Sequence, residues 1–175
     1  GDLVVQKATE LGAERLLPFA AERSVVRLDP RRAAERVRRW RRIAAEAARQ
    51  SGRADVPEVD PPAPLQVVLA AAPQGFRRLV FHGAGGEHLA EAVDPGAAGH
   101  LLVVGPEGGL APSEVDQCLA AAARVASLGP RVLRAETAAV AAASRNTAAP
   151  AAMARRRKSS RRAPSASTAS TRARR

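Results

Sequence analysis

The chain has 175 residues and a mass of 18.3 kDa, a length typical of one domain. Its content of hydrophobic residues, 46%, is ordinary for a globular protein and excludes disorder of the whole chain. Only 2% of the residues are aromatic, which argues against a site that stacks single-stranded bases on aromatic rings. The net charge of +11 is concentrated in residues 151–175, which hold nine of the 28 basic residues and no acidic one, so the other 150 residues carry 19 bases against 17 acids.

Cysteine usage and apolar runs exclude several further classes of protein. The single cysteine, Cys118, cannot form an internal disulfide, and no Cys/His cluster has zinc-ligand spacing, so we predict no metal site. No apolar run has the length of a membrane span, and no signal peptide is recognisable. These patterns indicate the reducing cytoplasm and no membrane partner. Because Gly1 stands within a helical pattern, we expect the sequence to be a piece of a longer chain.

In the first third of the chain, apolar spacing predicts a helix over 3–11 that ends at Gly12, and then a short strand over 16–19. Asp29, followed by a proline, is expected to cap a helix over 30–50. The apolar face of this helix, with its tryptophan in the core, consists of Ala33, Val37, Trp40, Ala44 and Ala47. The opposite, basic face consists of Arg32, Arg36, Arg39, Arg42 and Arg49.

Residues 54–75 are rich in proline and predict a loop, after which strands and helices alternate as in a parallel α/β sheet. The expected strands are 78–81, 101–104 and 124–128, and the expected helices are 87–93, 114–123 and 136–143. Periodicity ends near Arg145, so we predict one domain over 1–144 and a disordered basic tail over 145–175. The tail either binds RNA phosphates without specificity or has no role.

Glycine-containing loops follow the expected strands at 82–86, 105–109 and 129–134. Ligands of parallel sheets gather at the carboxyl ends of the strands, and glycine lets a backbone approach a ligand closely. None of the three loops matches the G-x-G-x-x-G or G-K-[ST] pattern of a phosphate-binding loop. The spacing alone therefore leaves two interpretations open: a site for a nucleotide-like ligand, or plain connections between strands and helices.

Two of these loops belong to longer motifs, VGPEGGL at 104–110 and SLGPRVLRAETA at 127–138. Further motifs precede them: QKATELG at 6–12, ERS at 22–24 and EAARQSGR at 46–53. Together, and in this order over residues 3–143, the motifs resemble the bacterial small-subunit rRNA uridine-N3 methyltransferases of the SPOUT superfamily.

The resemblance implies an α/β domain with a deep trefoil knot, a homodimer, and S-adenosylmethionine (SAM) bound in the knot. The methyl group would go to N3 of a uridine in the 16S rRNA of the small ribosomal subunit. The loops of this fold hold the cofactor largely through backbone groups, and a side chain at Gly105, Gly108 or Gly129 would fill space that the adenosine needs. The implied cofactor-binding residues are Phe81, His82, Gly83, Val104, Gly105, Pro106, Glu107, Gly108, Gly109, Leu128, Gly129, Leu133, Arg134, Glu136 and Thr137.

Methylation of N3 requires removal of the imide proton or stabilisation of the uracil anion. If the resemblance holds, Glu107 or Glu136 accepts the proton, and Arg134, Arg23 or Arg53 stabilises charge on the uracil oxygens. The structural alternatives are that Glu107 interacts with the positive end of the next helix and that Glu136 caps the last one. The implied catalytic residues are Arg134, Glu107, Glu136 and Arg23.

The basic face of the helix over 30–50 is either a solvated surface or, with an rRNA substrate, a set of phosphate contacts. The residues expected to contact RNA are Arg23, Arg39, Arg42, Arg49, Gln50 and Arg53. We expect two departures from the family: the PUA-like N-terminal domain is absent from this sequence, and the sequence runs on from the last helix, at Ala143, into the basic tail. A smaller departure is Ala111, which stands where a serine N-cap is usual, with Ser113 as a substitute. Two other functions remain open: an RNA-binding module or fragment without turnover, and a SPOUT methyltransferase that acts on another RNA.

Overall fold

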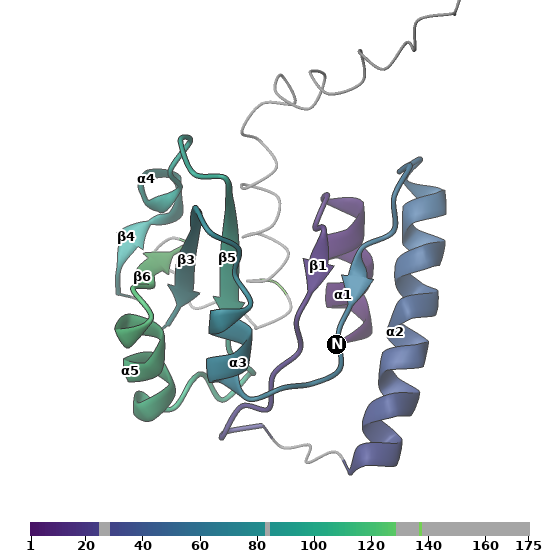
Figure 1. The fold of residues 1–175 in the computed structure, drawn as a ribbon, viewed down its shortest axis with the longest axis horizontal. Coiled ribbons are helices and arrows are strands. Elements are labelled where there is room, and N and C mark those ends of the chain that lie inside the picture. Colours follow the sequence, from purple (N-terminus) through teal and green to yellow (C-terminus); the bar gives the residue numbers. More distant parts are fainter. Residues whose placement is uncertain (25–28, 83–84, 129–136, 138–175) are drawn as a thin grey trace, which may run out of the picture.

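The computed structural model describes residues 1–24, 29–82, 85–128 and Thr137 (Figure 1). The helices and strands, in chain order, are α1 (Asp2–Glu10), β1 (Arg15–Leu16), α2 (Pro30–Gln50), β2 (Glu58–Val59), α3 (Leu65–Ala70), β3 (Phe76–Phe81), β4 (Glu87–His88), α4 (Leu89–Ala92), β5 (Gly99–Val104), α5 (Pro112–Ala120) and β6 (Arg124–Ser127). Thr137, the last described residue, is helical. Figure 1 shows two groups of elements, β1 and β2 with α1 and α2 in one, and β3 to β6 with α3, α4 and α5 in the other.

The start of α2 follows from the sequence as predicted. The Asp29 carboxylate accepts hydrogen bonds from the backbone N–H groups of Arg31 and Arg32, both at 3.0 Å, and Pro30 occupies the first turn. The end of α1 is also confirmed, because Gly12 adopts φ +93° just after the C-cap and its N–H bonds the Thr9 carbonyl. Both helix boundaries therefore result from local capping chemistry.

The strands form two parallel sheets, which confirms the predicted α/β class. One sheet has the order β4-β6-β3-β5 and the other pairs β1 with β2. The strand predicted over 78–81 extends from Phe76, and the strand predicted over 101–104 begins at Gly99. In a parallel sheet these strands need crossover connections, and α4 and α5 lie in two of them.

The strand predicted over 16–19 is reduced to β1, with an isolated bridge from Phe19 to Ala63, and two further predictions of local structure were wrong. Residues 54–75 are not only a loop, because they contain β2 and α3, and Leu65, Val68 and Leu69 of α3 are buried. Residues 87–93 do not form one helix: β4 comes first, paired with β6, and only the four residues of α4 are helical. In both places a two-residue strand forms because a partner strand distant in sequence is available.

The hydrophobic core of the larger sheet lies between the sheet and its helices. Cys118 of α5, fully buried, packs in one cluster with Leu65, Val80, Val103 and Leu110. Burial raises the pKa of the Cys118 thiol, and the nearby Glu114 carboxylate raises it further. Trp40 of α2 packs against α1, as predicted for a core residue. Its indole N–H donates a hydrogen bond to the Asp2 carboxylate of α1 at 3.2 Å. Within the described ranges, no helix has both the length and the apolar character to cross a membrane.

Candidate functional site

The carboxyl ends of β3, β5 and β6 lie next to one another. Phe81, the last residue of β3, is in register with Val104 at the end of β5 and with Ala126 of β6. The chain therefore leaves all three strands at the same edge of the sheet, as the sequence predicted for the loops after Phe81, Val104 and Leu128. Phe81, Val104 and Leu128 are half-buried at this edge, and His82 is exposed.

The loop over 105–109 is a tight backbone turn with no space for a side chain at its base. The Gly109 N–H donates to the Pro106 carbonyl at 2.8 Å, and Gly109 has a φ of +71°, a conformation that favours glycine. A Cβ at Gly105 would lie 2.9 Å from Leu110 Cγ and 3.0 Å from Leu110 N. Leu110 is buried in the core, so the base of the loop rests directly on the packed interior.

Arg23 lies against this loop, although 85 residues separate it from Gly108 in the sequence. Its guanidinium donates to the Gly108 carbonyl at 3.4 Å, and a Cβ at Gly108 would lie 3.3 Å from the Arg23 Cβ and carbonyl oxygen. The structure thus brings together two of the predicted catalytic residues, Arg23 and Glu107, at one loop. Glu107 is exposed, and within the described residues no hydrogen bond or ion pair engages its carboxylate.

Glu114 holds the two segments of this site together, and the sequence analysis did not identify it. Glu114 is buried, with only 6% of the residue exposed. Its carboxylate accepts hydrogen bonds from the Ala111 N–H at 2.7 Å and from the Glu22 N–H at 2.9 Å. The first bond is the glutamate half of a capping box at the start of α5, since Ala111 has no side-chain acceptor. Ser113 does not replace the missing cap, because its hydroxyl bonds the Glu22 carboxylate at 3.2 Å. The signal in the sequence was a glutamate three residues after a cap position without a polar side chain.

Of the remaining predicted cofactor residues, Pro106 and Gly108 belong to the same turn, and Thr137 is helical and exposed. The predicted residues that lie outside the described part of the chain are Gly83, Gly129, Leu133, Arg134 and Glu136. The expected last helix over 136–143, apart from Thr137, and the tail over 145–175 lie outside it too. The described part of the predicted site is therefore the loop after β5 with Arg23, together with Phe81, His82 and Leu128 at the same edge of the sheet.

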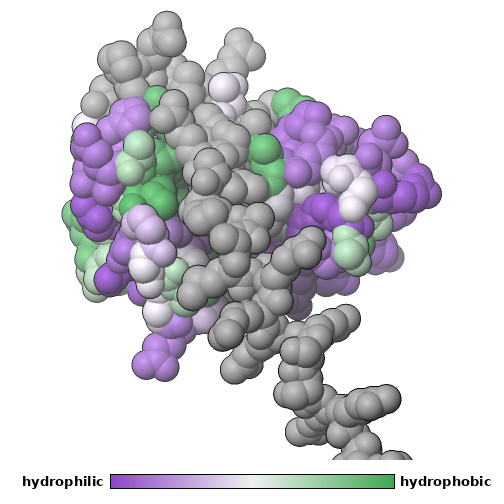
Figure 2. Space-filling view, turned by 90° about the horizontal axis from the view of Figure 1, so that it is seen from above, coloured by the Kyte–Doolittle hydropathy of each residue, from purple (hydrophilic) through white to green (hydrophobic). Residues whose placement is uncertain are grey.

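The basic face of α2 is exposed, and its arginines differ in how much of their charge is already paired. Arg39 forms an ion pair with Asp2 at 2.5 Å, and Arg49 pairs with Glu46 on the same helix. Arg42 is exposed without a hydrogen bond or ion pair to any described residue. Seen from above, the flank formed by α2 is predominantly hydrophilic (Figure 2). This surface has the charge that phosphate contacts require.

The RNA-binding candidates at the end of α2 lie far from the glycine loop. Figure 1 shows α2 beginning at the end of the molecule to which β3 and β5 point and running away from it. Arg49 follows Pro30 by 19 positions, which corresponds to roughly 28 Å along a helix axis. Contacts of Arg49 and Gln50 with RNA would therefore be remote from a base bound at the loop.

Arg53 has a structural role in this fold. Its Nη1 donates to the carbonyl oxygens of Thr9 at 2.6 Å and Ala13 at 2.9 Å, and its Nη2 pairs with Asp55 at 2.8 Å. Its side chain is only 13% exposed. Arg53 therefore links the motif at 46–53 to the motif at 6–12, at the ends of α1 and α2. This geometry favours a structural role for Arg53 over contact with uracil.

Replacing Arg53 by alanine is expected to lower the free energy of unfolding by about 1–3 kcal/mol, because two partly buried carbonyls lose their donor.

Replacing Arg42 by alanine, by contrast, is expected to change the free energy of unfolding by less than about 0.5 kcal/mol. If this surface contacts RNA phosphates as predicted, R42A should weaken RNA binding in filter-binding titrations and reduce the slope of log K against log salt concentration, by about 0.7–0.9 for one lost phosphate contact. Urea denaturation of both variants and the salt titration separate the two roles. Equal stability of the two variants would contradict the assignment for Arg53.

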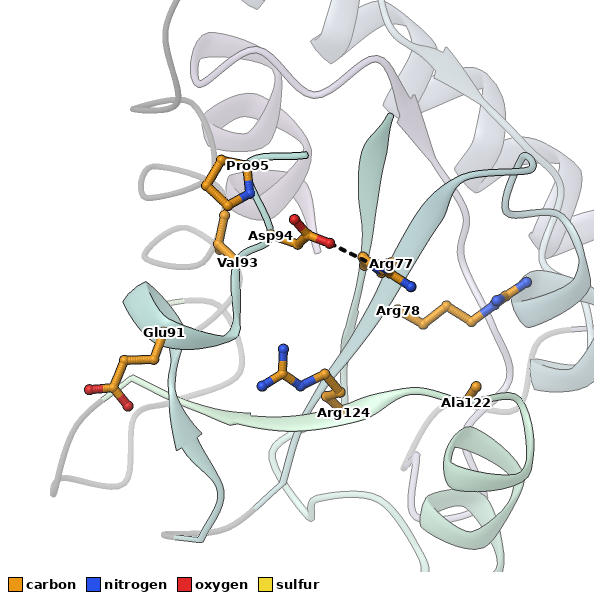
Figure 3. A pocket seen from close by; sticks show the side chains of 8 residues that line it. All are labelled: Arg77, Arg78, Glu91, Val93, Asp94, Pro95, Ala122 and Arg124. Atoms are coloured by element: carbon orange, nitrogen blue, oxygen red, sulfur yellow. Dashed lines mark hydrogen bonds and ion pairs between the residues drawn. The ribbon is translucent and has the colours of Figure 1, made fainter. Parts of the chain in front are cut away.

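A separate cavity of about 360 Å³ lies at the opposite edge of the sheet (Figure 3). It is lined by Arg77, Arg78, Glu91, Val93, Asp94, Pro95, Ala122 and Arg124. Its arginines are engaged: Arg77 pairs with Asp94 at 3.0 Å, Arg78 donates to the Leu69 carbonyl at 2.9 Å, and Arg124 pairs with Glu87. The Gly96 N–H and Arg77 both lower the pKa of Asp94, the N–H more strongly. This network stabilises the amino ends of β3 and β6 and is distinct from the glycine loop.

Comparison with known proteins places the chain in a family. The model of the RNA methyltransferase domain matches residues 1–146. The ribosomal RNA small subunit methyltransferase E of Mycobacterium bovis is 40% identical over 145 residues, which are 81% of this chain and 55% of that protein. The protein of the same name from Bacillus subtilis is 41% identical over 143 residues, 77% of this chain and 56% of that protein.

Solved structures of methyltransferases are also similar to this chain in fold and sequence. A methyltransferase of Legionella pneumophila in complex with SAM superposes with a TM-score of 0.76 and 33% identity, over 82% of this chain and 58% of that one. The ribosomal RNA small subunit methyltransferase E of Neisseria gonorrhoeae, bound to SAM, gives a TM-score of 0.74 and 34% identity, over 81% and 57%. The chain spans about half the length of the curated relatives it matches. The resemblance inferred from the motifs is confirmed, and the chain belongs to the RNA methyltransferase domain family.

Proposed function

We propose that this chain is the SAM-binding and catalytic domain of a methyltransferase that methylates N3 of a uridine in 16S rRNA. The observation that carries the proposal is the loop after β5, where Gly105 has no space for a side chain and Arg23 contacts the Gly108 carbonyl. The names of the curated relatives, which specify the small-subunit ribosomal RNA, and the neighbouring structures bound to SAM support it.

The loop over 105–109 fits a cofactor held by backbone groups. Among the described residues, no hydrogen bond uses the N–H groups of Glu107 and Gly108. Both residues are exposed at the carboxyl edge of a parallel sheet, where ligands of α/β folds bind. Free backbone donors at this position can hydrogen-bond the polar atoms of an adenosine. When bound, SAM supplies a methyl group that its sulfonium already activates.

The residues of the chain have to orient the uracil and handle the proton on N3. The exposed Glu107 carboxylate, which has no partner among the described residues, is available to accept that proton. Arg23, held beside the loop by the Gly108 carbonyl, can stabilise negative charge on a uracil oxygen. We assign the same two roles to Glu136 and Arg134, respectively.

The remaining features are inferred from the family resemblance. We infer a trefoil knot in the domain over 1–144, a homodimer, a cytoplasmic location, and the small ribosomal subunit as the partner. The exposed arginines of α2 support contact with rRNA phosphates, with Arg42 as the strongest candidate because its charge has no described partner.

The proposal is tested in two steps with the full chain. Calorimetric titration should show micromolar binding of SAM and none of ATP, as expected of a working SAM site. Incubation with methyl-labelled SAM and small ribosomal subunits should then yield N3-methyluridine, detected by mass spectrometry of the digested 16S rRNA. SAM binding without transfer would instead favour an RNA-binding module, and absence of SAM binding would contradict the proposal.

Single replacements of Glu107, Arg134 and Glu136 by alanine are expected to lower the rate of methyl transfer, by about 10²–10⁴-fold for the group that accepts the proton. The affinity for SAM should change much less, because the loop backbone rather than these side chains is proposed to hold the cofactor. Single-turnover assays and calorimetry on each variant measure the two effects. E91A, a change at an exposed carboxylate on the opposite edge of the sheet, is the matched control. Unchanged transfer rates in all three variants would contradict the catalytic assignments.

A further inference from the structure

The positive charge of residues 1–150 is concentrated on α2. This helix holds eight arginines and two glutamates, whereas the other residues of 1–150 hold 11 bases and 15 acids. This part of the chain is therefore strongly positive along α2 and negative outside it. In Figure 2 the flank that α2 forms is predominantly hydrophilic. Such an asymmetry directs a polyanion to one surface of the molecule.

Three arginines form a row along the exposed face of α2. Arg31, Arg38 and Arg42 are separated by seven and four residues, which are close to two turns and one turn of a helix. All three are exposed, and the buried residues of α2, among them Val37 and Ala44, lie on the opposite face. We call these three arginines the outer row. Its ends are 11 positions apart, roughly 16 Å along the helix axis.

The outer row differs from the neighbouring arginines in its lack of partners. The side chains of Arg31, Arg38 and Arg42 have no hydrogen bond or ion pair to a described residue. The arginines on the flank beside the row are engaged: Arg32 pairs with Asp29 at 3.4 Å, Arg39 pairs with Asp2 at 2.5 Å, and the Arg36 guanidinium lies 5.8 Å from the centre of the Trp40 ring. A phosphate bound at the outer row would therefore break no interaction with the described part of the chain.

The chemistry of this face fits a duplex better than unpaired bases. Proteins that bind single strands stack the bases on aromatic rings, but Trp40, the only aromatic residue of α2, packs against α1. Double-stranded RNA is recognised mostly by its shape and through its phosphates and sugars. A duplex also holds its phosphates in fixed positions, so a straight row of charges can contact several of them without the cost of ordering a flexible chain. The outer row therefore matches a double-stranded segment.

The outer row also has a suitable place relative to the glycine loop. Figure 1 shows that α2 begins at the end of the molecule to which β3 and β5 point. Arg31 follows Arg23 by only eight positions, and Arg23 contacts the Gly108 carbonyl at that end. A duplex that lies along the outer row would have one end directed toward the loop, and the rest of it would extend away from the loop.

We propose that the outer row of α2 docks on the phosphates of a double-stranded RNA segment, by shape and without sequence preference. This inference rests on the proposed function, because the segment would belong to the rRNA substrate and lead to the base that is held at the loop. Arg49 continues the row by seven further positions. Its ion pair with Glu46 is exposed and therefore weak, so Arg49 can join the contact.

The test uses the full chain and an RNA duplex of about 20 base pairs, long enough for a shape-reading contact, with a sequence unrelated to 16S rRNA. In filter-binding titrations, R38Q/R42Q should weaken duplex binding by about tenfold and reduce the slope of log K against log salt concentration by about 1.4–1.8, for two lost phosphate contacts. Binding of one of the single strands should weaken by a smaller factor, because a flexible strand can follow other basic segments such as residues 151–175.

R32Q/R36Q is the matched control, since it removes the same charge from the same helix at two arginines that already have partners. This variant should bind the duplex within about threefold of the unmodified chain. Urea denaturation of both variants shows that they are folded. A second duplex of different sequence should be bound as tightly as the first one.

Three results would overturn the proposal. Equal losses of duplex affinity in R38Q/R42Q and R32Q/R36Q would show a dependence on net charge rather than on the outer row. Equal losses for the duplex and the single strand would show that the row does not select a duplex. Unchanged duplex binding of R38Q/R42Q would show that the row is a solvated surface.

Calorimetric titration with SAM separates this inference from the proposed function. R38Q/R42Q should bind SAM as the unmodified chain does, because the outer row is not part of the glycine loop. If the docking inference fails, SAM binding and methyl transfer remain as proposed. If the proposed function fails, the unmodified chain does not bind SAM, and its affinity for the duplex is unaffected.

Discussion

Replacing Gly105 by alanine is expected to weaken the binding of SAM by at least about tenfold, and by more if the loop moves away from the cofactor. The added Cβ would lie within 3.0 Å of the Leu110 side chain and backbone and 3.1 Å from the Gly109 carbonyl carbon. Leu110 is 1% exposed and packs against Val103 and Cys118, so it cannot move aside without disturbing the core. The loop has to shift instead, and its free N–H groups shift with it. Overpacking of this kind also lowers the free energy of unfolding, by about 1–3 kcal/mol.

The measurement is calorimetric titration of G105A with SAM, together with urea denaturation to show that the variant is folded. G96A is a matched control because Gly96 is exposed at the other edge of the sheet and its Cβ would meet only the Asp94 carboxylate, at 3.3 Å. This control should bind SAM as the unmodified chain does. A folded G105A with unchanged SAM affinity would show that the loop after β5 does not hold the cofactor.

The parts of the fold that the sequence predicts are those with local causes. Asp29 and the proline after it locate the start of α2, and Gly12 locates the end of α1, because capping depends on neighbouring residues. The strands predicted over 78–81 and 101–104 are apolar enough to identify from the sequence alone, although each begins two residues earlier in the structure. By contrast β2 is two residues long and exists because β1 lies beside it, a pairing that joins Leu16 to Val59. No local pattern in a proline-rich segment indicates such a partner.

The residues of the candidate site also fall into two groups: those that the local sequence predicts and those that depend on packing between distant segments. The loop after β5 could be located because parallel sheets gather ligands at the carboxyl ends of their strands, and its glycines stand out in the sequence. Arg23 was a candidate only through the family resemblance, and its contact with Gly108, 85 positions away in the sequence, is known only from the structure. The bonds from Arg53 to Thr9 and Ala13 could not be inferred, because they depend on how α1 and α2 pack. An arginine in a motif therefore indicates importance, but only the structure distinguishes a buried joint from a ligand contact.

Glu114 is the residue whose removal is expected to destabilise the site most. In E114A the N–H groups of Glu22 and Ala111 lose their acceptor, and the free energy of unfolding should fall by about 2–4 kcal/mol, since each unsatisfied buried donor costs about 1–3 kcal/mol. The segment containing Arg23 loses its hydrogen bond to α5 at the same time. Arg23 should then hold the Gly108 carbonyl less firmly, so that methyl transfer falls further than the loss of folded protein explains. E114Q retains one acceptor oxygen and should be intermediate in both properties.

Urea denaturation and single-turnover methyl transfer, measured at a temperature where every variant is folded, separate the two effects. D116A is the matched control, because Asp116 is an exposed carboxylate on the same helix with no hydrogen bond or ion pair to a described residue. It should remain within about 0.5 kcal/mol of the unmodified chain. If E114A were as stable as D116A, the buried carboxylate would not be the link between the ERS segment over 22–24 and the start of α5. If E114A were destabilised but the folded enzyme transferred methyl groups at the normal rate, Glu114 would stabilise the fold without positioning Arg23.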